Sequence, residues 1–294
     1  MYWDKYLMPR SLEEALSMLV YYGGSARVVA GGTDLMLQVQ EGKHQVKALV
    51  DISGLADLKQ VREDGDYLRV GALCTHSQIA GSSLVLAKVP ALAGAAASVG
   101  SPQIRNVGTL GGNVVNAQPA ADTSIALTAL EAGAVVVSAR GREIRPLGDL
   151  FAGVGRSSVD PTAEIIAEFL IPLPAGQAGS SFQRLSRRKA LTLPVLNAAV
   201  AVELDSQLKN FQRARIAVGP VAQVPWRAME AEELLAGAPV SNSAIREAGL
   251  EASEKARPRD SLRGGAEYRK QMVRVLVCRA LKDAVERLGG VVNG

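Results

Sequence analysis

The stretch Val28-Val29-Ala30-Gly31-Gly32-Thr33-Asp34-Leu35 decides how the first part of this chain is interpreted. A short apolar strand, Ala26–Ala30, runs directly into the paired glycines. Glycines at such a turn expose successive backbone N–H groups, and Thr33 adds a hydroxyl donor, so the turn can receive a phosphate oxygen. The stretch matches neither the dinucleotide fingerprint nor the P-loop. Taken alone, a plain strand-ending turn would produce the same pattern.

A second glycine-rich segment runs Arg105-Asn106-Val107-Gly108-Thr109-Leu110-Gly111-Gly112-Asn113. Its glycines let a backbone approach a ligand closely, and Thr109 and Asn113 bring hydrogen-bonding side chains to the same place. Asp122 follows shortly afterwards and can accept from a ribose or ribityl hydroxyl, or serve as a helix N-cap, or both. The two segments lie about 75 residues apart, and together they predict a diphosphate held between two lobes.

The first lobe is expected over about residues 1–55 and is read as a small α+β unit. Ser11–Tyr22 has a helical pattern, and Ser11 with Glu14 forms the sequence signature of a capping box. A strand at Ala48–Ile52 follows the first glycine loop.

The second lobe is expected over residues 56–175 and a C-terminal α+β domain over residues 176–294. In the second lobe we predict strands at Tyr67–Gly71 and Glu164–Ile171, a hairpin over Ala134–Arg145, and helices at Ser77–Ala87, Ala91–Val99 and about Asp122–Glu131. Pro174–Ser181 reads as a linker. Beyond it we predict strands at Phe182–Ser186, Val195–Leu204 and Arg213–Val218, then helices at Arg227–Ala236, Asn242–Ala256 and Glu267–Leu288.

The composition narrows the function classes. A net charge of +4 over 294 residues, with scattered Lys and Arg, does not favour nucleic acid. The sequence contains no long apolar run of the kind that spans a membrane and no signal-peptide core near its start, so we expect a cytoplasmic protein. Two cysteines, Cys74 and Cys278, and two histidines, His44 and His76, give too few ligands for an expected metal or iron–sulfur site. A redox cofactor of this chain would therefore be organic.

With both loops considered together, the sequence resembles the FAD-binding subunit of the molybdenum hydroxylases, the family of xanthine dehydrogenase, carbon monoxide dehydrogenase and 4-hydroxybenzoyl-CoA reductase. The resemblance rests on Ala30–Leu35 followed by Ile104–Asn113, and extends to Arg187–Val195 and Tyr268–Val277. It implies an α+β fold: a two-lobed FAD-binding domain of the PCMH/vanillyl-alcohol-oxidase-like type, followed by a C-terminal α+β domain.

The resemblance also implies roles for individual residues. The first loop would wrap the FAD pyrophosphate, and the second would complete the cradle. Asp122 would hold sugar hydroxyls, Ile166 would form a wall beside the adenine or the ring system, and a basic residue, Arg184 with Gln183 as the fallback, would lie near the flavin pyrimidine edge. The expected FAD-binding residues are Val28, Val29, Ala30, Gly31, Gly32, Thr33, Asp34, Leu35, Val99, Gly100, Gly108, Thr109, Gly111, Gly112, Asn113, Asp122, Ile166 and Arg184.

The resemblance implies that substrate oxidation takes place elsewhere. The molybdenum cofactor and the iron–sulfur clusters would lie on partner subunits of a heterotrimer or its dimer, and electrons would leave FAD for an acceptor, NAD or another carrier. This chain would then need no catalytic nucleophile or base, and no metal. Arg105, Arg187, Arg188 and Lys189 would serve the cofactor, the partner interface or simply a solvated face.

Two other functions are compatible with the residues alone. One is a free-standing flavin oxidase or reductase, although the aromatic content of 4% supplies little to line a redox pocket. The other is a nucleotide-binding regulatory or assembly protein without a redox role. The identity of the bound nucleotide separates these alternatives from the electron-transfer subunit.

Overall fold

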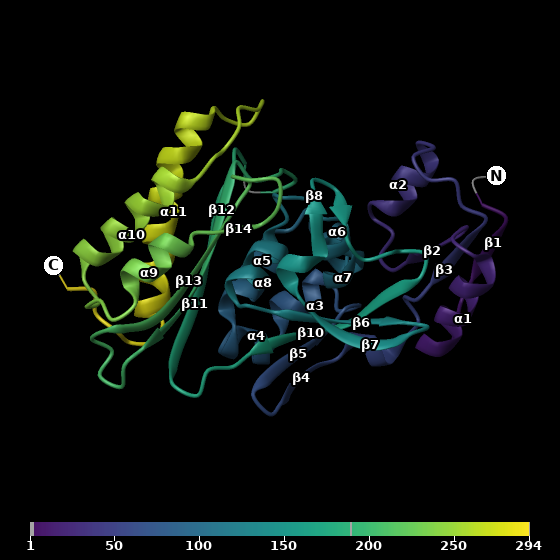
Figure 1. Cartoon of the computed structure of the whole chain (residues 1–294), viewed down its shortest axis with the longest axis horizontal. Coiled ribbons are helices and arrows are strands. Elements are labelled where there is room, and N and C mark those ends of the chain that lie inside the picture. Colours follow the sequence, from purple (N-terminus) through teal and green to yellow (C-terminus); the bar gives the residue numbers. More distant parts are fainter. Residues whose placement is uncertain (1–2, 189, 294) are drawn as a thin grey trace.

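The computed structural model describes residues 3–188 and 190–293, arranged as a succession of layers along one axis (Figure 1). A small three-stranded sheet with its helices lies at one end. A five-stranded sheet, a layer of short helices, a four-stranded sheet and a final layer of helices follow in that order. Among the described helices, none is long and apolar enough to cross a membrane.

The first lobe contains a parallel sheet in the order β1-β3-β2. Its elements are β1 (Lys5–Leu7), α1 (Leu12–Tyr22), β2 (Ala26–Val29), α2 (Leu35–Gln40) and β3 (Ala48–Asp51). Helix α1 begins where predicted, because the Ser11 side chain accepts from the Glu14 N–H at 3.2 Å. The reciprocal half of the capping box does not form; the Glu14 carboxylate instead accepts from the Arg10 N–H at 2.6 Å.

The second lobe contains an antiparallel sheet in the order β4-β5-β10-β6-β7. Its elements are the 3-10 turn η1 (Ala56–Lys59), β4 (Val61–Asp64), β5 (Tyr67–Gly71), α3 (His76–Gly81), α4 (Ser83–Lys88), α5 (Pro90–Ser98), α6 (Pro102–Val107), α7 (Leu110–Val115), α8 (Asp122–Ala129), β6 (Gly133–Ser138), β7 (Gly141–Pro146), the 3-10 turn η2 (Leu147–Leu150), β8 (Phe151–Gly153), β9 (Arg156–Ser157) and β10 (Glu164–Pro172).

Two predictions in this lobe are wrong in detail. The single helix expected over Ser77–Ala87 is two helices, because Ser82 leaves the helical conformation and its side chain caps α4 through the Val85 N–H at 3.4 Å. The glycine-rich segment is not an extended loop either. It holds parts of α6 and α7, each capped by its preceding hydroxyl residue, Ser101 or Thr109.

The C-terminal domain pairs an antiparallel sheet, in the order β11-β12-β13-β14, with helices on its outer face. Its elements are β11 (Gln177–Leu185), β12 (Leu196–Leu204), β13 (Phe211–Gly219), β14 (Trp226–Arg227), α9 (Met229–Leu235), α10 (Asn242–Lys255) and α11 (Ala266–Glu286). The linker predicted over Pro174–Ser181 is mostly wrong. Residues 177–181 form the start of β11 and pair with β12, so their small side chains pack in a sheet.

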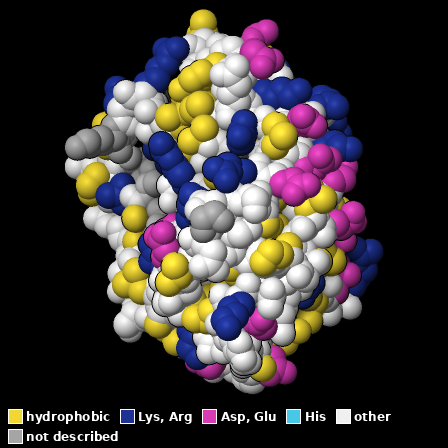
Figure 2. All heavy atoms as spheres, turned by 90° about the vertical axis from the view of Figure 1, so that its left-hand side faces the viewer, with side chains coloured by type: hydrophobic (Ala, Val, Ile, Leu, Met, Phe, Trp, Pro, Cys, Tyr) yellow, Lys and Arg dark blue, Asp and Glu magenta, His cyan; other side chains and the backbone are white. Residues whose placement is uncertain are grey.

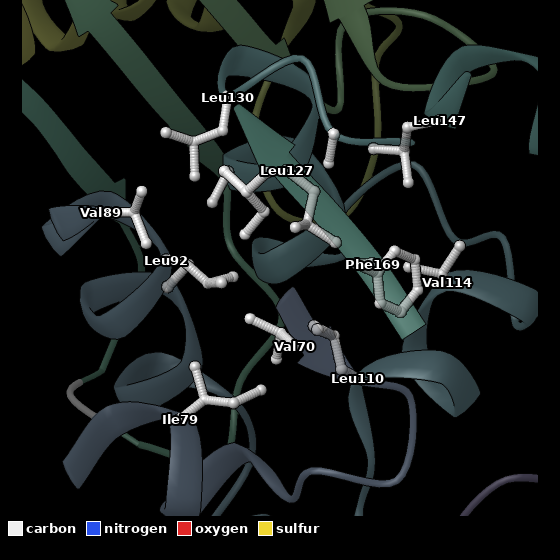
Figure 3. Close-up of a cluster of buried hydrophobic side chains, with 14 of the residues drawn as sticks. Val70, Ile79, Val89, Leu92, Leu110, Val114, Leu127, Leu130, Leu147 and Phe169 are labelled. Atoms are coloured by element: carbon white, nitrogen blue, oxygen red, sulfur yellow. The ribbon is translucent and has the colours of Figure 1, made fainter. Parts of the chain in front are cut away.

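The largest cluster of buried apolar side chains lies between the five-stranded sheet and the short helices (Figure 3). Phe169 on β10 is completely buried there and faces Leu110 and Val114 of α7. Ala199 and Ala217 of the C-terminal sheet belong to the same cluster. Helix α7, which carries part of the second glycine segment, is therefore held against the five-stranded sheet, and the position of that segment depends on this core.

We expect Phe169→Ala to lower the free energy of unfolding by about 3–5 kcal/mol, because it leaves a cavity in a core that cannot collapse around it. Chemical denaturation measures the effect. Phe169→Leu keeps most of the apolar volume and should cost clearly less. Equal losses in the two variants would contradict the assignment of Phe169 as a packing residue.

Candidate functional site

A cavity of about 630 Å³ lies where the first lobe meets the second. Both glycine loops line it, and so do residues from the β8–β9 hairpin and from the start of β10. The lining includes fifteen of the eighteen predicted residues: Val28, Val29, Ala30, Gly31, Gly32, Thr33, Asp34, Leu35, Val99, Gly108, Thr109, Gly111, Gly112, Asn113 and Ile166. The structure therefore brings together segments that are separate in the sequence.

The two loops touch directly at Gly31. A Cβ atom added at this position would overlap the carbonyl oxygen of Val107, the last residue of α6. Gly32, beside it, has a φ of +67°, in the left-handed region that glycine adopts most readily. The pair of glycines is thus required by the contact between lobes and by the turn itself. A side chain at Gly31 would therefore meet the protein backbone before it met a ligand.

The first loop presents unused backbone donors. Within the described part of the chain, the N–H groups of Gly31, Gly32, Thr33 and Asp34 donate no hydrogen bond. The Thr33 hydroxyl donates to Asp34 at 3.4 Å, and Asp34 precedes α2 without capping it through its side chain. Successive N–H groups of this kind form an anion-binding concavity. Gly31–Thr33 are half-buried and Asp34 is exposed, so these N–H groups are open to water or to an external acceptor.

The second loop differs, because most of its backbone donors are already paired. The Leu110 and Gly111 N–H groups donate to the carbonyl oxygens of Cys74 and Ala72 at 3.0 and 2.8 Å. The Gly112 N–H donates to the Thr109 hydroxyl at 3.1 Å. A Cβ on Gly111 would lie 2.9 Å from that of Ala72. This loop is therefore held against the segment after β5. Within the described part of the chain, the Thr109 backbone N–H and hydroxyl hydrogen remain available to a ligand.

Asn113 is both fixed by a hydrogen bond within the protein and able to donate to a ligand. Its side-chain oxygen accepts from the Thr123 hydroxyl at 2.7 Å, which orients the amide and leaves its NH₂ group as a donor at the cavity wall. The site thus offers hydrogen-bond donors on opposite sides of one cavity.

Gly100, Asp122 and Arg184 do not belong to the cavity lining. Asp122 is buried and accepts from Arg184 at 3.2 Å and from the Asn197 side chain at 2.7 Å. Burial raises the pKa of Asp122, and the charge of Arg184 opposes that rise. The nearby Ser98 side chain also lowers the pKa of Asp122, so this cluster lies just behind Val99.

Arg184 makes a second hydrogen bond, because its guanidinium also donates to the Thr192 carbonyl at 2.5 Å. The same loop returns to the second lobe, where the Leu191 N–H donates to the Gly100 carbonyl at 3.2 Å. Lys189 lies outside the described residues. The three predicted residues that are absent from the lining therefore form one region at the cavity's Val99 end.

Sequence reasoning missed several lining residues. Arg27, Lys43 and His44 gather at the first-lobe end, and His44 Nε2 lies 3.2 Å from the Gln38 side-chain oxygen. Burial lowers the pKa of His44, and the charges of Arg27 and Lys43 lower it further. His76 lines the cavity beside the second loop. No motif marks these residues, because they come from β2, from the segment after α2 and from the start of α3, which only the fold brings together.

Comparison with known proteins agrees with this geometry over the whole chain. Residues 3–174 match the family described as the FAD binding domain in molybdopterin dehydrogenase. Residues 181–284 match the CO dehydrogenase flavoprotein C-terminal domain. The chain is 33% identical to the nicotinate dehydrogenase FAD-subunit of Eubacterium barkeri, with 98% of each chain covered.

Solved structures give the same result. The chain superposes with a TM-score of 0.89 and 30% identity on a chain of carbon monoxide dehydrogenase from Hydrogenophaga pseudoflava, covering 97% of this chain and 98% of that one. For quinoline 2-oxidoreductase from Pseudomonas putida 86 the TM-score is 0.88 at 26% identity, with 97% of both chains covered.

We expect Gly31→Ala to lower the free energy of unfolding by about 1–3 kcal/mol even without a ligand, because the new methyl group overlaps the Val107 carbonyl and pushes the loops apart. Gly54→Ala is the matched control, since a Cβ there meets nothing within 4 Å. Thermal or chemical unfolding of both variants tests this. A Gly31→Ala protein as stable as the control would show that the contact between the loops is not tight.

Proposed function

The chain belongs to the FAD-binding medium subunits of the molybdenum hydroxylases, and we propose that the cavity between its lobes is the site where FAD binds in extended form. The observation that carries this proposal is the run of unpaired N–H groups at Gly31–Asp34 on the cavity wall. Four adjacent donors suit the oxygens of a diphosphate. Because Gly31 and Gly32 have no side chains, their N–H groups are not covered on the cavity side.

We assign the remaining positions from their places around this nest. Val28–Leu35 would surround the diphosphate, with Gly108–Asn113 opposite. Ile166 and Val99 would form apolar walls, and the Asn113 amide would donate across the cavity. The basic group of Arg27, Lys43 and His44 supports placing the adenosine part at the first-lobe end. The flavin ring would then lie toward Val99, near Gly100, Asp122 and Arg184.

The chain's own residues bind and orient the cofactor, exclude water from it and set the charge around it. When bound, FAD would supply the redox chemistry, taking electrons that arrive from iron–sulfur clusters on a partner and passing them to an external acceptor. Arg184 would place a guanidinium beside the ring region while being neutralised in part by Asp122. Gln183 makes no such ion pair, which supports Arg184 as the basic residue of this region.

The partners we propose are an iron–sulfur subunit and a molybdenum-cofactor subunit in a heterotrimer or its dimer, with NAD or another carrier as the acceptor. We place the assembly in the cytoplasm, which both free cysteines support, because paired cysteines mark oxidising compartments. The FAD-binding domain would comprise residues 1–175, divided at about residue 55, and the C-terminal domain residues 176–294.

One surface supports a docking site for the iron–sulfur subunit. The loops over residues 186–195 and 257–265 abut, because a Cβ added at Gly264 would lie 3.3 Å from the Val195 side chain. Leu262 is 94% exposed, and Leu191, Leu193 and Tyr268 are also exposed. Figure 2 shows apolar side chains beside Lys and Arg toward the upper end of this side of the molecule.

These loops also carry Arg187, Arg188, Arg257, Arg259 and Arg263 but only one acidic residue, Asp260. A surface that combines apolar anchors with arginines is typical of protein interfaces and would favour an acidic partner. Through Leu191 the surface adjoins Gly100 at the proposed flavin end, which is where an electron donor must approach.

A visible absorption spectrum of the purified chain, followed by acid release of the nucleotide, tests the proposed cofactor site. We expect a flavin spectrum and about one FAD per chain, before or after incubation with FAD. FMN, another nucleotide or no ligand after incubation would overturn the assignment and favour a regulatory protein. Oxidase turnover by the isolated chain would instead favour a free-standing flavoenzyme.

Leu262→Asp should weaken assembly with the iron–sulfur subunit, because it removes the most exposed apolar side chain and places a negative charge among arginines. Co-expression with both partner subunits and measurement of the copurified stoichiometry tests this expectation. Leu234→Asp on α9, also an exposed leucine (43%), is the control. Undiminished assembly of the Leu262→Asp variant would rule out this surface as the docking site.

A further inference from the structure

His76 is a buried side chain at the wall of the cavity that no role assigned so far requires. It is the first residue of α3, is only 2% exposed, and belongs to the cavity lining beside the second glycine loop. Its backbone N–H donates to the Gly108 carbonyl at 3.1 Å, so helix and loop are held together. The ring is thereby fixed next to the loop that faces the unpaired donors of Gly31–Asp34.

The imidazole makes no hydrogen bond within the described part of the chain. Nδ1 is buried and has no partner. The other edge of the ring is turned toward Gly108. A Cβ at position 108 would lie 3.3 Å from His76 Cδ2 and 3.7 Å from Nε2, and 3.0 Å from the Ile104 carbonyl. Because residue 108 is glycine, the Nε2 edge is not covered by a side chain on that side.

The surroundings of the ring determine its charge. Burial lowers the pKa of His76 to about 4, and the nearby charge of Arg105 on α6 contributes. Cys74, on the segment before α3, remains a thiol because burial raises its pKa to about 11. The second loop brings no charged side chain from Gly108 to Asn113. At neutral pH the ring is therefore an uncharged group with one N–H donor. The Asp34 carboxylate lines the same cavity on the facing loop, where it accepts from the Thr33 hydroxyl and not from His76.

We propose that His76 is a cofactor-binding residue that donates from Nε2 to a phosphate oxygen of FAD. This inference rests on the proposed function, because it requires the diphosphate to lie between the two glycine loops. An anionic oxygen is the partner that a buried neutral imidazole beside a cation still lacks. His76 would thereby add a side-chain donor on the second loop's side of the cavity, where most backbone N–H groups are already paired.

A consequence is that FAD binding and protonation of His76 are linked. A bound dianion favours the imidazolium, so the pKa of His76 is higher with FAD than without it. The affinity for FAD should therefore rise as pH falls through the pKa of the bound state and level off below the pKa of the ligand-free state. Arg105 opposes this gain. His44, near Arg27 and Lys43 at the far end of the cavity, titrates separately and has to be controlled.

The experiment follows both rings directly. The sequence contains only His44 and His76, so ¹⁵N-labelled histidine gives two sets of ring signals, assigned with His44→Gln and His76→Gln. Titrating the full chain with and without FAD gives both pKa values. Dissociation constants for FAD are measured alongside, between about pH 5 and pH 8, for wild type, His76→Gln, His76→Leu and His44→Gln.

We expect FAD to shift the His76 nitrogen signals and raise its pKa, and the wild-type affinity to increase severalfold on acidification. His76→Leu should bind FAD about 10- to 100-fold more weakly, the usual loss for a hydrogen bond to a charged group. His76→Gln, which retains a donor, should recover much of the affinity but lose the pH dependence. His44→Gln should keep that dependence.

A merely structural role would lower the melting temperature of both His76 variants without changing the pH profile of FAD binding. Wild-type FAD binding with unmoved His76 signals, or with the same pH profile in His76→Gln, would overturn the inference and leave the proposed function intact. Failure of the wild-type chain to bind FAD at any pH would instead be a failure of the proposed function.

Discussion

The contact between Gly31 and the carbonyl of Val107 sets the geometry on which the rest of the site depends. The first lobe is small, and its apolar cluster is completed by residues of the five-stranded sheet, such as Val135, Ile165 and Leu170. The position of the first lobe is therefore fixed by its packing on the second lobe and by the contact of Gly31 with α6. A larger residue at this point would open the cavity instead of merely narrowing it. Glycine is required here for a contact within the protein as much as for any ligand.

The two glycine loops share a composition but differ in what they offer. Most donors of the second loop are paired with Ala72, Cys74 and Thr109, and α7 is held against the five-stranded sheet by the core around Phe169. The first loop has left its donors unpaired and is followed only by the short helix α2. The second loop is therefore a fixed wall of the cavity, whereas the first loop has unpaired N–H groups that can bind a ligand. An anion between the loops would accept hydrogen bonds mainly from the first loop, while the second loop would determine the shape of the cavity around it.

Much of this arrangement could be predicted from local sequence. Ser11 begins α1, the strands around both loops lie where their apolar runs indicate, and fifteen predicted residues line one cavity. The failures have physical causes. Residues 177–181 look like a flexible linker because they are small and polar, yet their backbone is paired with β12. Helices α6 and α7 are too short to show periodicity. His76 was considered only as a metal ligand, because its burial beside Gly108 is a property of the fold and not of its neighbours in sequence.

The cluster of Asp122, Arg184 and Asn197 explains why a C-terminal domain belongs to this site. Asp122 begins α8 in the second lobe, whereas its two partners lie on β11 and β12 of the C-terminal sheet. A buried ion pair contributes little net stability, because desolvating both groups offsets their attraction, but removing either partner leaves a costly unpaired charge. The pair therefore restricts how the domains can dock more than it strengthens their docking. Arg184 also holds the Thr192 carbonyl, and Leu191 beside it bonds Gly100. The same few residues thus form part of the domain junction and of the Val99 end of the cavity. A shift of the C-terminal domain would therefore also move the residues at that end of the cavity.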